Sequence, residues 1–192
     1  MIRKTIFIFF VTAFYTSVAQ PLTKKNYRFS VTGGVGWSHY FNSLKIGTNL
    51  ANEDHIGFSC KVLWEPEHRL ALGLESGYYT FYAVERTSPT NPQVIGRATL
   101  SVLPIMLHIR CRVVKDFYLS TGAGVAMLLS RIEGVGGGID SQQTSFSNFQ
   151  LSALYLKPIH SRLRLGGEIK YLSVDKTDDE IISLMAVASF RF

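Results

Sequence analysis

His39 is the residue best placed for covalent chemistry, because two hydroxyl side chains, Ser38 and Ser43, lie close to it in the sequence. A serine activated by a histidine, which a carboxylate orients, performs acyl transfer. The carboxylates would come from three consecutive acids far along the chain, Asp178, Asp179 and Glu180. The alternative is a histidine in an aromatic belt beside a solvated acidic loop, the ordinary role of such a charge run. We expect this alternative, and therefore no enzyme activity and no catalytic residue. His39 is the one candidate if the chain does have a catalytic residue.

No other motif predicts a metal or cofactor site. The remaining histidines show no paired spacing with cysteines or carboxylates of the kind that zinc sites use; they are His55, His68, His108 and His160. Two glycine-rich stretches, 33–36 and 134–138, do not open a helix and lack the Gly-Lys-Ser/Thr ending of a phosphate-binding loop. We expect the first to pack inside the fold and the second to be a mobile loop, with no cofactor.

The elements that must position these residues are β-strands. From Tyr27 onward, apolar and small or polar residues alternate, and side chains of a strand point to opposite faces in turn. In the first segment one face carries Phe29, Val35 and Trp37, while the other carries mainly Gly and Ser. Eight such segments follow one another, which predicts an all-β fold.

The breaks between the eight segments alternate between long and short. The long breaks are residues 41–54, 83–98, 131–147 and 173–180, and the short breaks lie at 65–68, 115–116 and 158–161. An up-and-down barrel places alternate connections at opposite rims, so all the long loops would share one side. The pattern predicts an eight-stranded antiparallel up-and-down transmembrane β-barrel.

The polar face of the predicted strands mixes small residues with charged ones. The inward charges that we expect to form a buried ion network are Lys61, Glu75, Arg110, Glu168 and Lys170. A narrow, polar interior suits a small membrane barrel, and aromatic residues gather towards the strand ends, as in interfacial girdles. A soluble lipocalin-like barrel, with its apolar face inward, is the alternative.

The N-terminus has the layout of a secretory signal peptide. Arg3 and Lys4 precede an apolar run from Thr5 to Val18, which is short for a membrane span, and small residues follow it. We expect residues 1–20 to be the signal peptide and residues 21–192 to be one barrel domain. Removal of the signal peptide leaves 18 Lys and Arg residues against 14 Asp and Glu residues.

The remaining positive charge lies on strands and short turns, whereas the long breaks are acidic overall. This distribution argues against a nucleic-acid-binding stripe. The two cysteines, Cys60 and Cys111, fall on strands that a third strand separates, so we expect two free thiols.

Three stretches carry a family resemblance. They are residues 103–110 (Leu-Pro-Ile-Met-Leu-His-Ile-Arg), residues 116–124 (Asp-Phe-Tyr-Leu-Ser-Thr-Gly-Ala-Gly) and the last strand, which ends in Phe192. The chain resembles the small outer-membrane β-barrel domain family, the porin-like group of Bacteroidetes-type bacteria with the shape of OmpA and OmpX barrels. The resemblance implies the cell outer membrane, reached through the periplasm, and assembly by the barrel-assembly machinery through Phe192. It carries no catalytic residues, and fold alone does not fix function.

Side chains roughly fill the interior of an eight-stranded barrel, so a wide diffusion pore is not expected. We expect a structural or loop-mediated binding protein whose partners are the lipid bilayer, lipopolysaccharide and an unidentified extracellular ligand. Two alternatives remain open: an outer-leaflet lipid-modifying enzyme that uses His39, and a soluble periplasmic lipocalin-like carrier.

Overall fold

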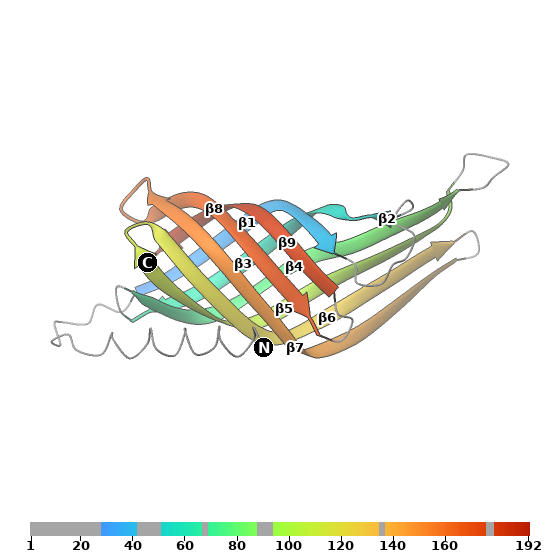
Figure 1. Cartoon of the computed structure of the whole chain (residues 1–192), viewed down its shortest axis with the longest axis horizontal. Helices are drawn as coiled ribbons and strands as arrows, with labels where there is room; N and C mark the ends of the chain where they lie inside the picture. The colour runs from blue at the N-terminus through green and yellow to red at the C-terminus, as the bar shows by residue number, and fades with distance from the viewer. Residues whose placement is uncertain (1–27, 42–50, 67–68, 88–93, 135–136, 176–178) are drawn as a thin grey trace, which may run out of the picture.

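The computed structural model describes residues 28–41, 51–66, 69–87, 94–134, 137–175 and 179–192 (Figure 1). The predicted signal peptide, residues 1–20, lies outside these ranges. Among the described residues, no helix is long and apolar enough to cross a membrane. The described chain forms one antiparallel sheet that closes on itself.

The sheet contains eight long strands and one very short one. They are β1 (Arg28–Phe41), β2 (Ala51–Asn52), β3 (Asp54–Glu65), β4 (Leu70–Thr87), β5 (Val94–Val114), β6 (Phe117–Gly134), β7 (Gly137–Pro158), β8 (Leu163–Val174) and β9 (Asp179–Arg191). The order is β2-β4-β3-β1-β9-β8-β7-β6-β5, and β5 pairs with β4 to close the barrel. The predicted eight-stranded barrel is confirmed, with β2 as an addition that pairs with β4.

The alternation of residue types places the two faces as predicted. On β9, every second residue from Asp179 to Ser189 is buried in the lumen, while the residues between them are exposed outside. The two chain ends of the barrel meet through β1 and β9, where Val31 pairs with Phe190 and Phe41 with Glu180. The buried core is therefore the inside of the barrel, and the apolar face is its outside.

In two of the predicted long loops, 83–98 and 131–147, the described residues are strand extensions. β4 and β5 continue as a ladder as far as the pair Thr87 and Val94, and β6 and β7 continue to Gly134 and Gly137. Both hairpins project beyond the rest of the barrel at one end (Figure 1). The outer part of the second hairpin is exposed on both faces, so it needs no apolar side and shows no hydrophobic alternation.

Glycines of the stretch 134–138 lie where the β6–β7 ladder ends. Gly134 pairs with Gly137, and Gly137 has a φ of 132°, which side chains disfavour. Gly134, Gly137 and Gly138 are therefore strand residues, although a loop was expected there, and residues 135–136 lie outside the described residues.

Pro104 lies within β5, although proline normally occupies an edge or a bulge because it has no N–H to donate. On the β6 side Pro104 is opposite Ala126. On the β4 side the ladder passes from the pair Ser76 and Ile105 directly to Tyr79 and Val102. The N–H group that Pro104 lacks therefore lies where the β4–β5 ladder is interrupted. Because that position pairs with no residue of β4, the strand tolerates a proline there.

Tyr79 is among the largest fully buried side chains, and two glycines make room for its ring. A Cβ added to Gly57 would lie 2.8 Å from Tyr79 Cδ1, and one added to Gly77 would lie 2.8 Å from Tyr79 Cε2. Real Cβ atoms do not approach so closely. The small residues on the inner face therefore provide the space for this tyrosine.

Gly57→Ala is expected to destabilise the barrel by about 1–3 kcal/mol, the usual effect of overpacking a well-filled interior. Gly33→Ala is the matched control, because a Cβ at this outward-facing position has no atom within 4 Å. Urea unfolding of both variants in lipid vesicles measures the difference. Equal stability of the two variants would contradict the packing around Tyr79.

Candidate functional site

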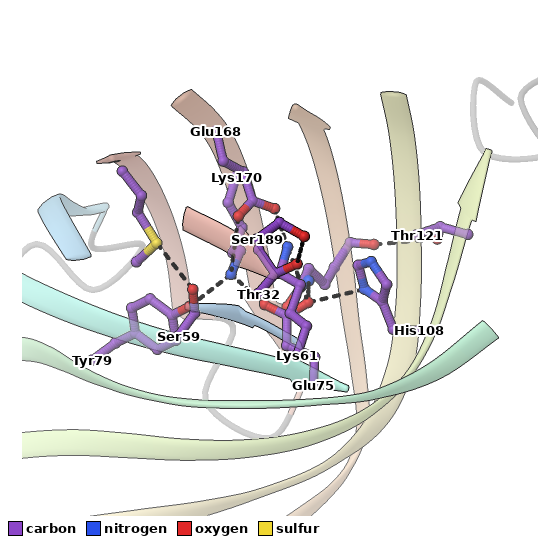
Figure 2. A network of polar contacts seen from close by, with 12 residues as sticks. Thr32, Ser59, Lys61, Glu75, Tyr79, His108, Thr121, Glu168, Lys170 and Ser189 are labelled. Carbon is purple, nitrogen blue, oxygen red and sulfur yellow. Dashed lines mark hydrogen bonds and ion pairs between the residues drawn. The ribbon is translucent and has the colours of Figure 1, made fainter. Parts of the chain in front are cut away.

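Glu75 is the centre of a polar network inside the lumen (Figure 2). Its Oε1 accepts a hydrogen bond from Lys170 Nζ, and its Oε2 accepts one from Gln150 Nε2 at 2.5 Å. The same Oε2 lies 2.9 Å from His108 Nδ1 and 3.5 Å from Lys61 Nζ. One carboxylate from β4 therefore connects side chains of β3, β5, β7 and β8.

A second carboxylate, Glu168, balances the charge of this network. Lys61 Nζ bonds to Glu168 Oε1, and Lys170 Nζ lies 3.9 Å from Glu168 Oε2. Lys170 also donates to the Tyr79 hydroxyl at 2.9 Å. The side chains of the two lysines and two glutamates are at most 1% exposed. Two positive and two negative charges thus compensate each other away from water, which a buried ion network requires.

The polar network of the lumen is suited to holding the walls of the barrel together. Apolar side chains fill the lumen as well, among them Phe81, Leu128 and Ile181, which belong to one buried cluster. Because charged and apolar side chains from opposite walls meet inside the barrel, the described interior has the packed character of small barrels.

Four of the five charges predicted to face inward meet in this network, and the fifth does not. Arg110 lies elsewhere in the lumen and pairs through Nη2 with Glu65 Oε1 at 2.6 Å. Glu65 also pairs with Arg191. Sequence reasoning missed Glu65 and Arg191 because one ends its strand beside a predicted turn and the other is next to the last residue of the chain.

His108 is a member of the network that the sequence analysis did not include among the inward-facing charges. Met106, His108 and Arg110 are all buried inside the barrel. The signal that could have found it is this shared parity, because residues two apart on a strand face the same side.

The outer face of the barrel is apolar around its middle. Leu74 and Leu107 are register partners on β4 and β5, and their exposed fractions are 59% and 61%. Aromatic residues lie near the strand ends, where Phe29 is opposite Trp64 and Phe117 is opposite Tyr155. A contiguous exposed apolar surface of this kind marks contact with a membrane or a large partner.

His39 lies on the outer face and contacts a carboxylate, but not the predicted one. Its Nδ1 is 2.8 Å from Oδ1 of Asp54, on the neighbouring strand β3. Its ring stacks on Trp37 and packs edge-on against Phe41, with centroids 5.7 and 4.8 Å apart. This is the position of a histidine in an aromatic belt.

The other members of the predicted Ser/His/acid group lie apart from His39. Ser38 points into the lumen, where its Oγ donates to the His55 carbonyl at 3.1 Å. Asp179 also points inward and accepts from the Tyr40 hydroxyl, while Glu180 accepts from Tyr171. Neither acid therefore meets His39 as predicted: Asp179 points to the opposite face of the sheet, and Glu180, on the outer face, bonds to Tyr171 instead. Ser43 and Asp178 lie outside the described residues.

Cys60 and Cys111 are both free cysteines, as predicted. They lie on β3 and β5, and β4 is between these two strands. Within the described ranges, His, Cys, Asp and Glu side chains form no group of three that could hold a metal ion.

A closed antiparallel barrel of eight long strands, with charged, polar and apolar side chains in its lumen and an apolar outer face, defines the fold class of the small outer-membrane β-barrels. Comparisons with solved structures agree. Ail of Yersinia pestis, solved in complex with the heparin analogue sucrose octasulfate, matches with a TM-score of 0.56 at 14% identity, over 86% of this chain and 99% of Ail.

Two further solved structures have the same fold. The Neisserial surface protein A matches with a TM-score of 0.52 at 15% identity, over 85% of this chain and 97% of that protein. A major outer membrane protein from Thermus thermophilus matches with a TM-score of 0.53 at 14% identity, over 87% of this chain and 100% of that protein. No protein-family model and no curated protein matches the chain. At these identities the similarity shows the fold.

Proposed function

We propose that this protein is an integral protein of the bacterial outer membrane that displays two β-hairpins at the cell surface as a binding platform. The observation that carries the proposal is the exposed apolar belt on the outside of the barrel, with Leu74 and Leu107 at its middle. In water such a surface would be unfavourable at about 25 cal/mol per Å². In a bilayer it is the surface that contacts lipid.

The orientation follows from the lengths of the connections. Short turns join β3 to β4, β5 to β6 and β7 to β8, whereas the two long hairpins project at the opposite end. In outer-membrane barrels the short turns face the periplasm and the long connections face outward. The hairpins of β4–β5 and β6–β7 therefore face the extracellular side.

Export and assembly complete the proposal. Residues 1–20 direct secretion as a signal peptide, and residues 21–192 form the barrel. The strand end with Phe190 and Phe192, whose rings pack edge to face at 5.0 Å, contacts the barrel-assembly machinery. In the membrane, lipopolysaccharide surrounds the outer half of the belt.

A binding role suits the hairpins better than transport or catalysis. Their exposed residues include two ion pairs, Arg97 with Glu85 and Arg131 with Asp140. The lumen is filled by side chains, which argues against a wide pore. The charged interior also argues against a lipocalin-like carrier, whose inner face would be apolar around its ligand.

Cysteine labelling of intact cells tests the proposed display. In a Cys60→Ala/Cys111→Ala background, Ser141→Cys on the β6–β7 hairpin is expected to react with a membrane-impermeant maleimide. Ser161→Cys, in the turn between β7 and β8, is the matched control at the opposite end; both serines are exposed. It is expected to react only after the outer membrane is permeabilised. The reverse pattern, or equal labelling, would overturn the proposed orientation.

A further inference from the structure

Five arginines meet at the short-turn end of the barrel, and we call them the arginine cluster. They are Arg69, Arg110, Arg112, Arg164 and Arg191. Closure of the barrel brings them together from positions far apart in the sequence. Arg112 N donates to the Arg69 carbonyl at 2.6 Å, and Arg110 and Arg191 both bond to Glu65.

Glu65 is the carboxylate that pairs with this cluster, and both of its oxygens accept hydrogen bonds. Its Oε1 accepts from Arg110 Nη2 at 2.6 Å and from Ser30 Oγ at 2.9 Å. Its Oε2 accepts from Arg191 Nη2 at 2.5 Å. One negative charge therefore faces several guanidinium groups.

Tyr118 holds the other guanidinium groups without supplying a charge. Arg164 Nη1 donates to its hydroxyl at 2.8 Å. The guanidinium carbons of Arg110 and Arg112 lie 5.1 and 5.8 Å from its ring centroid. Such cation–π contacts orient the guanidinium groups but leave their charge uncompensated.

Donors of the cluster also remain unused. Arg110 Nη1, Arg112 Nε and Arg191 Nε have no hydrogen-bond partner among the described residues. Arg110 is only 2% exposed, so its free donor is not solvated by bulk water. A buried charged donor without an acceptor is unfavourable, and such a group normally has a partner.

A small cavity lies beside two of these three arginines, Arg110 and Arg191. Arg69, Arg110, Arg191, Glu65 and Tyr118 contribute to its wall, and its volume is about 10 Å³. This is close to the space that one water-sized oxygen atom requires. Arg69 is exposed at the rim, so the cavity adjoins the surface of the short-turn end.

We propose that the arginine cluster is a phosphate-binding site. One phosphate oxygen enters the cavity and accepts from Arg110 Nη1, while the exposed Arg69 approaches the oxygens that remain outside. Guanidinium groups match phosphate geometry, and an excess of positive charge from several strands suits a tetrahedral anion of high charge better than a planar carboxylate. The phosphate is either free in solution or the headgroup of a phospholipid in the adjacent leaflet; the second source rests on the proposed membrane orientation.

Phosphorus-31 NMR of the purified full-length barrel in a maltoside detergent tests the site. Inorganic phosphate and soluble dihexanoyl phosphatidylglycerol are the two probes. Saturable line broadening with inorganic phosphate alone identifies free phosphate as the ligand. Saturable broadening with phosphatidylglycerol, with or without inorganic phosphate, identifies the headgroup. Broadening with neither probe overturns the proposal.

Three variants make the test specific to the cluster. Arg69→Gln is expected to weaken binding about tenfold, which corresponds to the loss of one charge-assisted hydrogen bond. Arg97→Gln, at the hairpin end, is the matched control and leaves the affinity unchanged. Glu65→Gln removes the competing charge and is expected to tighten binding. Equal affinities for wild type and Arg69→Gln would overturn the site, and a retained gel shift on boiling shows that each variant is a folded barrel.

Discussion

Glu75→Gln lowers the free energy of unfolding of the barrel by about 3–5 kcal/mol, because removing one partner of a buried ion pair leaves an uncompensated charge. Glu75 contacts both Lys61 and Lys170, and all three side chains are at most 1% exposed. The amide of glutamine keeps the size of the side chain but leaves two lysines facing one carboxylate, Glu168. Urea unfolding in lipid vesicles, followed by the fluorescence of Trp37 and Trp64, measures the loss.

Two further variants test whether the loss of stability comes from the uncompensated buried charge. Glu85→Gln breaks an ion pair with Arg97 in which both side chains are 52% exposed, so it is expected to change stability by less than about 1 kcal/mol. Adding Lys170→Met to Glu75→Gln restores the balance of charge and is expected to recover part of the stability. A Glu75→Gln barrel as stable as the Glu85→Gln barrel would show that the network does not support the fold.

Leu107→Arg is expected to destabilise the membrane-inserted barrel by about 2–4 kcal/mol, the effect of an arginine on the lipid face near the bilayer midplane. Leu107 is 61% exposed and its partner Leu74 is 59% exposed. In a water-soluble barrel the same change at an exposed site would have little effect. The sign and size of this change therefore report directly on what surrounds the belt.

Ile139→Arg is the matched control for the belt. Ile139 is 69% exposed, but it lies on the β6–β7 hairpin opposite Ile132. Because this hairpin extends beyond the barrel (Figure 1), the arginine stays in water and is expected to be nearly neutral. Unfolding of both variants in the same vesicles gives the comparison, and an equal loss at the two positions would contradict the proposed membrane boundary.

The barrel itself could be predicted because one face of every strand had to be apolar. The sequence therefore alternates with a period of two residues, and this alternation alone predicts that Glu75, Lys170 and Arg110 face the lumen. The β6–β7 hairpin extension escaped prediction because both of its faces are exposed to water. No hydrophobic period remains there, so residues 131–147 read as a loop although most of the described residues pair as strand.

The partners of individual side chains could not be predicted from parity alone. His39 was expected to meet acids of the last strand, but its carboxylate is Asp54 on the strand at its other side. Which neighbour a side chain contacts depends on strand register and tilt, and these follow from closure of the whole barrel. For the same reason the ion pair of Glu65 and Arg191 could not be predicted, because it depends on β3 and β9 lying on either side of β1.

Gel electrophoresis in SDS of boiled and unboiled membrane fractions tests most directly whether this chain is an inserted barrel. A closed antiparallel ladder resists SDS at room temperature, so the protein is expected to pellet with the outer membrane and to change mobility on boiling. A protein found in the soluble periplasmic fraction, with the same mobility before and after boiling, would contradict the membrane barrel.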